Sequence, residues 1–592
     1  MLDLIIKGGT IVDGLGTPAH EGDVGIRDGV IVALGRVDER ATRMIDATGA
    51  VVTPGFIDAH THYDGQVTWD DELVGSASNG VTTAVIGNCG VGFAPVRPGG
   101  EAELIDLMEG VEDIPGTALY EGIPWGNWES FTEYLGFLGG RSWSLDIAAQ
   151  LPHAALRHYV MGERAYAEAP GEGLATEADI AEMTRIARES AEAGATGFST
   201  SRILFHRSMS GRSVPGTHAP EAELLAIAEA MRAGGVGIVQ AIPANGESEV
   251  PNVGGDPNRL LEEVRMLARI SRKADVRCTF TTSQHSAHPN LFREVLATTR
   301  AENEAGARLT PMIIPRAATV LTTLTAYHLF MRRPTYLRLA ESLPHAELVD
   351  ALRDPAVKAA ILSEQDHPHE SPGSMENSMP RFFSKALPRT FRMTDPVDYE
   401  PPLDQSLAAL AAAAGRNEED FLYDFLLEDG GTVVGMYLAV NYVDGNLDAA
   451  REMLSDPNTV TGLSDAGAHV NFISDMSVPT FHLTHWVRDR NRGERLPIEL
   501  VVSKLTSKPA QTFGLNDRGA LKIGLRADLN VIDLDRLTVR PPVMLHDLPA
   551  GGSRFIQPAE GYIATIVRGI PTRMADVDTG ERPGRLARPA RL

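Results

Sequence analysis

Short runs that alternate apolar and polar residues, separated by glycine turns, occupy both ends of the chain. The stretches DLIIKGGTIVDG and GDVGIRDGVIVALG lie near the start, and the same pattern returns late in LKIGLRADLNVIDLD and YIATIVRGIPTRM. Alternation with a period of two and frequent turns is typical of antiparallel strands. We therefore expect residues 1–52 and 516–580 to form one small β-sandwich, and the basic tail 581–592 to be either disordered or strapped over the surface.

Between these ends, strand-like apolar runs alternate with helical runs. TEADIAEMTRIARESAEAG and PEAELLAIAEAMRAGG, for example, repeat apolar residues every three or four positions, as amphipathic helices do. Eight alternating units predict an α/β fold, a (β/α)8 barrel of the TIM type, which we place at 53–515. The eight strand-like runs are 51–62, 80–90, 145–151, 195–201, 235–242, 276–284, 308–315 and 459–465.

Two connections in the predicted barrel are unusually long. Residues 91–144 include the aromatic-rich IPWGNWESFTEYLGF, and residues 316–458 are mostly helical with a Pro-rich break. Insertions that follow barrel strands lie on the catalytic face of this fold. We expect both insertions to wall or cover a substrate pocket.

Composition narrows the class of protein. The 592 residues are 43% hydrophobic, and 54 basic against 79 acidic residues give a net charge of −25, which disfavours nucleic acid and anionic membranes as partners. Two cysteines, Cys89 and Cys278, cannot make a disulfide framework. The start lacks a signal-peptide pattern, and the longest apolar stretch, at 407–414, is too short to span a bilayer, so we expect a cytoplasmic protein. The sequence leaves open whether the chain forms a homo-oligomer.

The sharpest chemical feature is GFIDAHTHYDGQ at 55–66. His60 and His62 stand two apart at the end of a strand, so both rings lie on one face, where neutral imidazole nitrogens can hold a divalent metal. A second pair, His367 and His369, lies in a Pro-rich loop without a strand to align the rings, and we do not expect a metal there.

Several motifs together resemble a known family. GFIDAHTH near the start and SDAGAH near the end of the predicted barrel are similar to the amidohydrolase superfamily. GVTTAVIGNCGVGFAP, EAGATGFSTS, LTSKPAQTFGL and GALKIGLRADLNVIDLD narrow the resemblance to N-acyl-D-amino-acid deacylases, or D-aminoacylases. It covers nearly the whole chain.

The resemblance implies roles for four residues. His60 and His62 match the paired metal ligands of the first strand, and Asp465 matches an aspartate that binds metal and shuttles the proton. Cys89 matches a cysteine that ligates zinc and can bridge two metals. The implied cofactor is zinc.

The chain departs from the family at the second metal position. Where strands five and six of the family each supply a histidine, this chain has Gln240 and Gln284, with His285 one residue out of phase. The fourth run, ATGFSTSRI, has no lysine that could be carbamylated to bridge two metals. Because an amide oxygen is a weak zinc ligand, we expect one zinc per chain, with two as the alternative.

Three residues are candidates for binding the substrate. Arg316 follows the seventh run and Arg202 the fourth, and a guanidinium can grip a carboxylate with two hydrogen bonds. For Arg316 a surface ion pair is the competing interpretation. His469 closes SDAGAH and is expected to donate a hydrogen bond near the metal.

The function predicted from these residues is zinc-dependent hydrolysis of the amide bond of N-acyl amino acids, with D configuration implied by the resemblance. Zinc would lower the pKa of a bound water to about 7, and Asp465 would accept its proton and pass it to the leaving amine. The predicted partner is thus a small-molecule N-acyl amino acid.

Three other functions are weighed against it. A cyclic-amide hydrolase of the hydantoinase or dihydroorotase kind is disfavoured by the missing lysine, and an aminohydrolase that releases ammonia is the other enzymatic alternative. A catalytically inactive, metal-free scaffold is disfavoured because His60, His62, Cys89 and Asp465 are all present.

Overall fold

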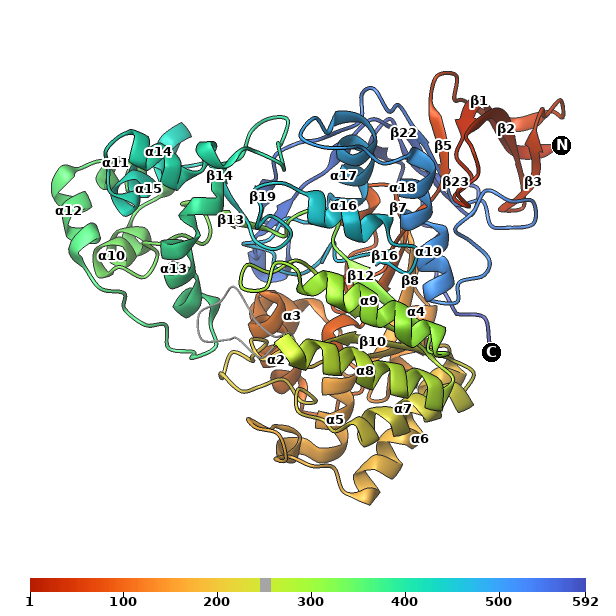
Figure 1. Cartoon of the computed structure of the whole chain (residues 1–592), viewed down its shortest axis with the longest axis horizontal. Coiled ribbons are helices and arrows are strands. Elements are labelled where there is room, and N and C mark those ends of the chain that lie inside the picture. The colour runs from red at the N-terminus through yellow and green to blue at the C-terminus, as the bar shows by residue number, and fades with distance from the viewer. Residues whose placement is uncertain (245–256, 592) are drawn as a thin grey trace.

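The computed structural model describes residues 1–244 and 257–591, and an eight-stranded parallel sheet lies at its centre (Figure 1). The strands follow one another around the sheet in chain order, and each predicted run supplies one strand of the barrel. The predicted (β/α)8 barrel is thus confirmed. They are β6 (Phe56–Asp58), β7 (Val81–Ile86), β8 (Asp146–Pro152), β9 (Gly197–Ser201), β10 (Ile238–Ile242), β11 (Arg277–Thr281), β12 (Leu309–Ile313) and β16 (Val460–Thr461).

The barrel is joined between its first and last strands just beyond their carboxyl ends. The backbone N–H of His62 donates to Ala466 O over 2.9 Å, and that of Asp465 donates to His60 O over 3.3 Å. The segments that bring the barrel together are therefore also those that carry the predicted metal ligands.

Helices surround the barrel as the periodicity predicts. In α6 (Glu177–Ala193), Thr176 and Asp179 form a capping box at the start, and Gly194 ends the helix in a left-handed conformation. No helix in the described parts of the chain is long and apolar enough to cross a membrane. The others against the barrel are α5 (His153–Met161), α7 (Glu221–Ala233), α8 (Pro257–Ala274), α9 (Leu291–Glu304), α18 (Ile498–Leu505) and α19 (Ser507–Thr512).

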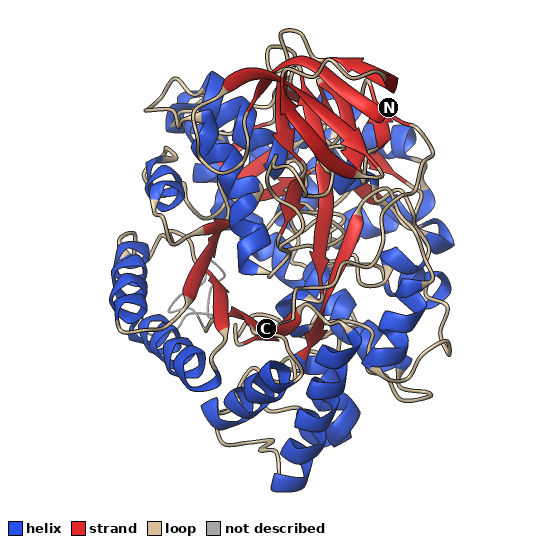
Figure 2. Ribbon diagram, turned by 90° about the vertical axis from the view of Figure 1, so that its right-hand side faces the viewer, coloured by secondary structure: helices blue, strands red, loops and turns tan. Residues whose placement is uncertain are grey.

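Both ends of the chain share a nine-stranded sheet, which Figure 2 shows beside the N-terminus. The two ends meet where β5 pairs antiparallel with β17, Val52 opposite Val531. The predicted run 51–62 is thus split, β5 joining the terminal sheet and β6 the barrel. Gly55 lies between the two strands. A larger residue would not fit there without a shift, because a Cβ would lie 2.2 Å from Thr82 Oγ1. The strands are β1 (Leu2–Ile11), β2 (His20–Arg27), β3 (Val30–Gly35), β4 (Ala41–Asp46), β5 (Val51–Pro54), β17 (Leu529–Ile532), β22 (Tyr562–Val567), β23 (Ile570–Met574) and β24 (Val577–Asp578).

The first insertion folds into three helices packed on the barrel: α2 (Glu101–Glu112), α3 (Gly116–Gly122) and α4 (Phe131–Gly139). Leu104, Leu107 and Leu138 on these helices are buried in the same core as the barrel strands. The first insertion is therefore part of the barrel's wall.

The second insertion forms most of a lobe with its own apolar core, green in Figure 1. It is mostly helical, as predicted, but also contains a three-stranded sheet that the sequence pattern did not predict. Its helices are α10 (Pro334–Ser342), α11 (His345–Leu352), α12 (Pro355–Ser363), α13 (Met375–Ala386), α14 (Leu407–Ala413), α15 (Glu418–Leu426) and α16 (Asp448–Ser455), and its strands are β13 (Thr319–Thr322), β14 (Thr390–Arg392) and β15 (Gly435–Leu438).

The tail is a strap across the amino end of β8 rather than a disordered end. Gly584 and Trp143 exchange two backbone hydrogen bonds, and Ala587 N–H donates to Ile147 O over 2.7 Å. The Arg585 N–H donates to the Asp146 carboxylate over 2.7 Å. Because Ala587 is buried, the tail adds apolar contact as well as hydrogen bonds.

We expect a chain that ends at Gly580 to lose roughly 2–4 kcal/mol of unfolding free energy, because these hydrogen bonds and the buried contact disappear. Urea unfolding followed by circular dichroism measures the loss. A chain that ends at Ala590 keeps the strap and should match the full chain. Equal stability of the Gly580 and full-length chains would show that the strap contributes nothing.

Candidate metal centre

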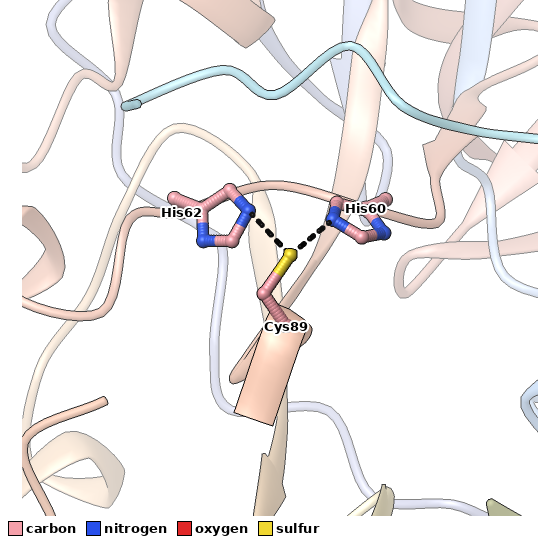
Figure 3. Close-up of side chains that lie close together, drawn as sticks. All are labelled: His60, His62 and Cys89. Atoms are coloured by element: carbon pink, nitrogen blue, oxygen red, sulfur yellow. Dashed lines mark hydrogen bonds between the residues drawn. The ribbon is translucent and has the colours of Figure 1, made fainter. Parts of the chain in front are cut away.

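Two imidazoles and a thiol meet at the carboxyl end of the barrel (Figure 3). Cys89 Sγ lies 3.4 Å from His60 Nε2 and 3.6 Å from His62 Nε2, and all three side chains are buried. Imidazole nitrogen and thiolate sulfur are the donors that zinc prefers in proteins. This cluster is the one group of three or more His, Cys, Asp or Glu ligand atoms found within 4.8 Å of one another in the described residues.

Asp465 comes to the same point from the other end of the barrel sequence. Its Oδ1 lies 3.5 Å from His60 Nε2 and 3.9 Å from His62 Nε2. Ligand atoms around one tetrahedral zinc, at the usual bond lengths, lie about 3.3–3.8 Å apart. The structure thus brings Asp465 beside both imidazoles, while the ligand atoms that lie within 4.8 Å of one another are those of His60, His62 and Cys89. Asp465 is also the most open of these four residues, with 21% of its side chain exposed.

A strained turn after β7 places Cys89. Its backbone is left-handed at φ 54°, which costs roughly 1 kcal/mol or more for a residue with a side chain. Asn88 holds the turn by donating its side-chain amide to Thr61 O and Val85 O. Gly87 cannot be replaced without a shift, because a Cβ there would lie 2.2 Å from Gln150 O. The GNCG motif is therefore explained by the turn that aims the thiol.

The SDAGAH turn does the same for Asp465 and His469, which are left-handed at φ 48° and 50°. Gly467, between them, packs directly on the histidine segment, since a Cβ there would lie 2.8 Å from His62 O and 2.7 Å from Tyr63 Cδ1. The glycine thus allows the two ligand-bearing segments to approach each other.

Burial sets the protonation of the cluster. It lowers the pKa of His60 to about 3, with His206 and His469 adding to the shift, and it lowers the pKa of His62 well below its ordinary value. Both imidazoles are therefore neutral, as metal ligands must be. Burial likewise raises the pKa of Cys89 and of Asp465 well above their usual ranges. A bound cation reverses this tendency and favours the thiolate and carboxylate.

The three residues predicted near a second metal position have polar partners in the structure. Gln240 places its amide Nε2 2.9 Å from His60 Nδ1, on the side of the ring that faces away from Cys89. Gln284 donates its amide to Asp444 over 2.8 Å. His285 Nε2 lies 3.1 Å from Ser283 Oγ. Gln240 is thus a partner of His60, and Gln284 is a partner of Asp444.

Sequence reasoning missed one acidic residue at this centre, Glu112, the last residue of α2. It is 1% exposed, with Oε1 3.5 Å from His62 Nδ1 and Oε2 3.4 Å from His469 Nε2. Burial, and then Asp465, raise its pKa well above the ordinary range. The one signal in the sequence is a pair of acids at the end of a helix, where the helix dipole disfavours negative charge.

His469 lies beside Glu112, with its Nε2 3.4 Å from Glu112 Oε2. Burial lowers its pKa to about 3, and His206 adds to the shift, so the ring is neutral. The side chain remains 14% exposed.

The two arginines predicted to bind substrate have internal partners. Arg316 is fully buried and donates to Asp475 over 2.9 Å and to Ser474 O over 2.8 Å. Arg202 donates to the Glu263 carboxylate over 2.6 and 3.0 Å. Arg316 thus forms an ion pair with Asp475, as the competing interpretation held, but this pair lies in the interior and not at the surface. Arg316 Nε and Nη1 make no hydrogen bond to a described residue, but because both arginines are buried, a substrate carboxylate could reach them only if the surrounding structure opened.

The amidohydrolase family model matches residues 43–572. D-aminoacylase of Alcaligenes xylosoxydans xylosoxydans is 27% identical over 595 residues, which cover 99% of this chain and 98% of that protein. N-acyl-D-aspartate deacylase of the same organism is 28% identical over 592 residues, 99% of this chain and 95% of that protein.

Solved structures show the same fold. A D-aminoacylase studied for its binuclear metal centre has a TM-score of 0.64 at 22% identity, over 99% of this chain and 100% of that chain. N-acyl-D-glutamate deacylase from Bordetella bronchiseptica, solved with zinc and a phosphonate inhibitor, has a TM-score of 0.62 at 22% identity, over 99% of each chain.

We expect Arg316→Ala to destabilise the protein by about 3–5 kcal/mol, because Asp475 would be left buried without its cation. Denaturant unfolding measures this. Arg353→Ala, which removes half of an exposed ion pair, is the control and should cost less than about 1 kcal/mol. A stable Arg316→Ala protein with weakened kcat/KM for free acids, but not for their esters, would instead identify Arg316 as a substrate clamp.

Proposed function

The chain belongs to the amidohydrolase family and is a hydrolase of carbon–nitrogen bonds other than peptide bonds, and from this premise we propose that it hydrolyses N-acyl-D-amino acids. The products are a carboxylic acid and a free amino acid. The observation that carries the proposal is the convergence of His60, His62, Cys89 and Asp465 at the mouth of the barrel. Relatives named D-aminoacylase and N-acyl-D-aspartate deacylase, each aligned with nearly the whole chain, support the substrate class.

The donor set suits zinc, and we propose one ion per chain, held by His60, His62 and Asp465 with Cys89 as the fourth ligand. Imidazole nitrogen, thiolate sulfur and carboxylate oxygen are all zinc ligands in proteins. When bound, zinc would polarise the amide carbonyl and make a water more acidic. One ion is favoured over two because Gln240 and Gln284 take the places of histidines and neither points at a second cluster.

Asp465 carries the proton in the proposed reaction. It accepts one proton from the water that attacks the amide carbon, and it returns that proton to the nitrogen as the carbon–nitrogen bond breaks. Its side chain is the exposed member of the cluster, so it can reach both water and substrate. The left-handed turn fixes its carboxylate beside the two imidazoles. His469, also partly exposed, is placed to donate a hydrogen bond to the substrate.

A panel of N-acyl amino acids in both configurations, scored by amine release, tests the proposal directly. We expect turnover of D substrates by the zinc-loaded protein. Ring opening of a hydantoin or dihydropyrimidine without amide turnover would favour the cyclic-amide alternative. Absence of hydrolysis on every substrate, together with absence of bound metal, would favour the inactive scaffold.

We expect Asp465→Asn to lower kcat by at least about 10²-fold, the usual scale for general acid–base catalysis. Asparagine has the same shape and can still touch a metal, but it cannot carry the proton. Steady-state kinetics of protein with matched zinc content measures the effect. Asp404→Asn, at an exposed position far along the chain, should be unchanged. Near-normal turnover of Asp465→Asn would remove Asp465 from the mechanism.

We expect about one tightly held zinc per chain by elemental analysis, and a large loss in His60→Ala and in Cys89→Ala. In contrast, His367→Ala, in the exposed second histidine pair, should retain the metal, which separates a specific site from adventitious binding. Two tightly held ions in the unmodified protein would contradict the proposed single site.

A further inference from the structure

The two metal-directed imidazoles have their second nitrogens turned outward, each toward one side chain. His60 Nδ1 lies 2.9 Å from the amide nitrogen of Gln240, which can only donate, whereas His62 Nδ1 lies 3.5 Å from Glu112 Oε1, which can accept. Their Nε2 atoms meet at Cys89. A histidine that binds metal through one nitrogen usually donates the other N–H to a carboxylate, a carbonyl or water, and this partner fixes the ring's tautomer and orientation.

We propose that Glu112 is the positioning residue of the metal centre: it holds His62 in its metal-binding tautomer and couples that ring to His469. This inference rests on the proposed metal centre. It adds Glu112, from the first insertion, to the residues that would orient the ligands of that centre.

The unpaired atoms point to this partnership. His62 Nδ1 and Glu112 Oε1 are both buried, and neither makes a hydrogen bond to any described residue. They lie 3.5 Å apart, and both side chains are 1% exposed. A buried donor and a buried acceptor that lack hydrogen bonds are costly. A small movement of the two side chains toward each other would form one hydrogen bond that satisfies both. Glu112 Oε2 at the same time faces His469 Nε2 at 3.4 Å.

The imidazoles of His62 and His469 are the basic side chains beside Glu112. No ion pair in the described residues joins it to a lysine or arginine. It stands at the carboxyl end of α2, where the helix dipole opposes an anion. A cation bound by His62 would supply the missing positive charge, because it makes the Nδ1–H a stronger donor to the carboxylate.

Three segments hold Glu112 in place. Gly110, one half-turn earlier, packs against the loop after β9, since a Cβ there would lie 2.4 Å from Arg207 O. Asp113 accepts hydrogen bonds from Tyr327 in the second insertion, over 2.7 Å, and from the Asn471 N–H. The carboxylate therefore has a fixed position from which it can orient a ring.

Glu112→Gln keeps the size of the side chain and removes its charge, so it tests the inference. We expect zinc to be held 10–100-fold more weakly in competition with a chromogenic chelator, the usual effect of losing such a partner. Cobalt substitution should show an altered visible spectrum. Glu121→Gln, exposed in the same insertion, is the matched control and should match the unmodified protein within about twofold.

The metal-free proteins separate positioning from a merely structural role. We expect metal-free Glu112→Gln to unfold at the same temperature as the unmodified metal-free protein or higher, because it loses an unpaired buried carboxylate. In a His62→Ala background, Glu112→Gln should weaken zinc binding no further. Zinc affinity equal to that of the unmodified protein, or an equal effect in both backgrounds, would overturn the inference.

If Glu112→Gln does not fold, Glu112→Asp decides, because it keeps the charge but draws the carboxylate back by one methylene. Zinc binding weakened severalfold supports positioning, and unchanged binding overturns it. Since these readouts need no substrate, they are independent of the proposed reaction. An unmodified protein that holds no metal would overturn both the metal centre and this inference, whereas normal zinc affinity in the Glu112 variants would overturn this inference alone.

Discussion

The close packing of imidazoles, a thiol and carboxylates in the interior is the constraint on which this structure depends. Two neutral imidazoles, a thiol and two carboxylates meet where water is largely excluded. Each such group is costly to bury alone, and together the acids repel one another. A divalent cation at their centre would offset both costs, and the left-handed turns at Cys89 and Asp465 hold the thiol and the carboxylate near the imidazoles.

The barrel and the cluster are built by the same segments. The first strand has three residues and the last has two, and the two ends meet through hydrogen bonds between the His60–His62 segment and the SDAGAH turn. Closure of the barrel therefore determines the distances between ligands. The terminal sheet and the tail strap stabilise other faces of the barrel, away from the ligands.

The insertions do more than cover the barrel. Glu112 reaches the back of His62, and its neighbour Asp113 is bonded to Tyr327 in the second insertion. A continuous set of contacts thus runs from the helical lobe to the metal-directed imidazoles. The lobe's placement can in this way influence the geometry of the centre as well as access to it.

The sequence by itself determined the eight barrel strands and the pairing of the two ends in one β domain, and its resemblance to a family pointed to His60, His62, Cys89 and Asp465. Period-two runs, strand-end histidines and glycine-rich turns are local signals, and they report local structure directly. Only the tertiary structure decided that Arg316 is internal, that Gln240 supports His60, and that Glu112 belongs to the centre. Burial and charge pairing depend on neighbours far away in the chain, and a glutamate at the end of an amphipathic helix carries no local mark of the carboxylates and imidazoles that folding brings beside it.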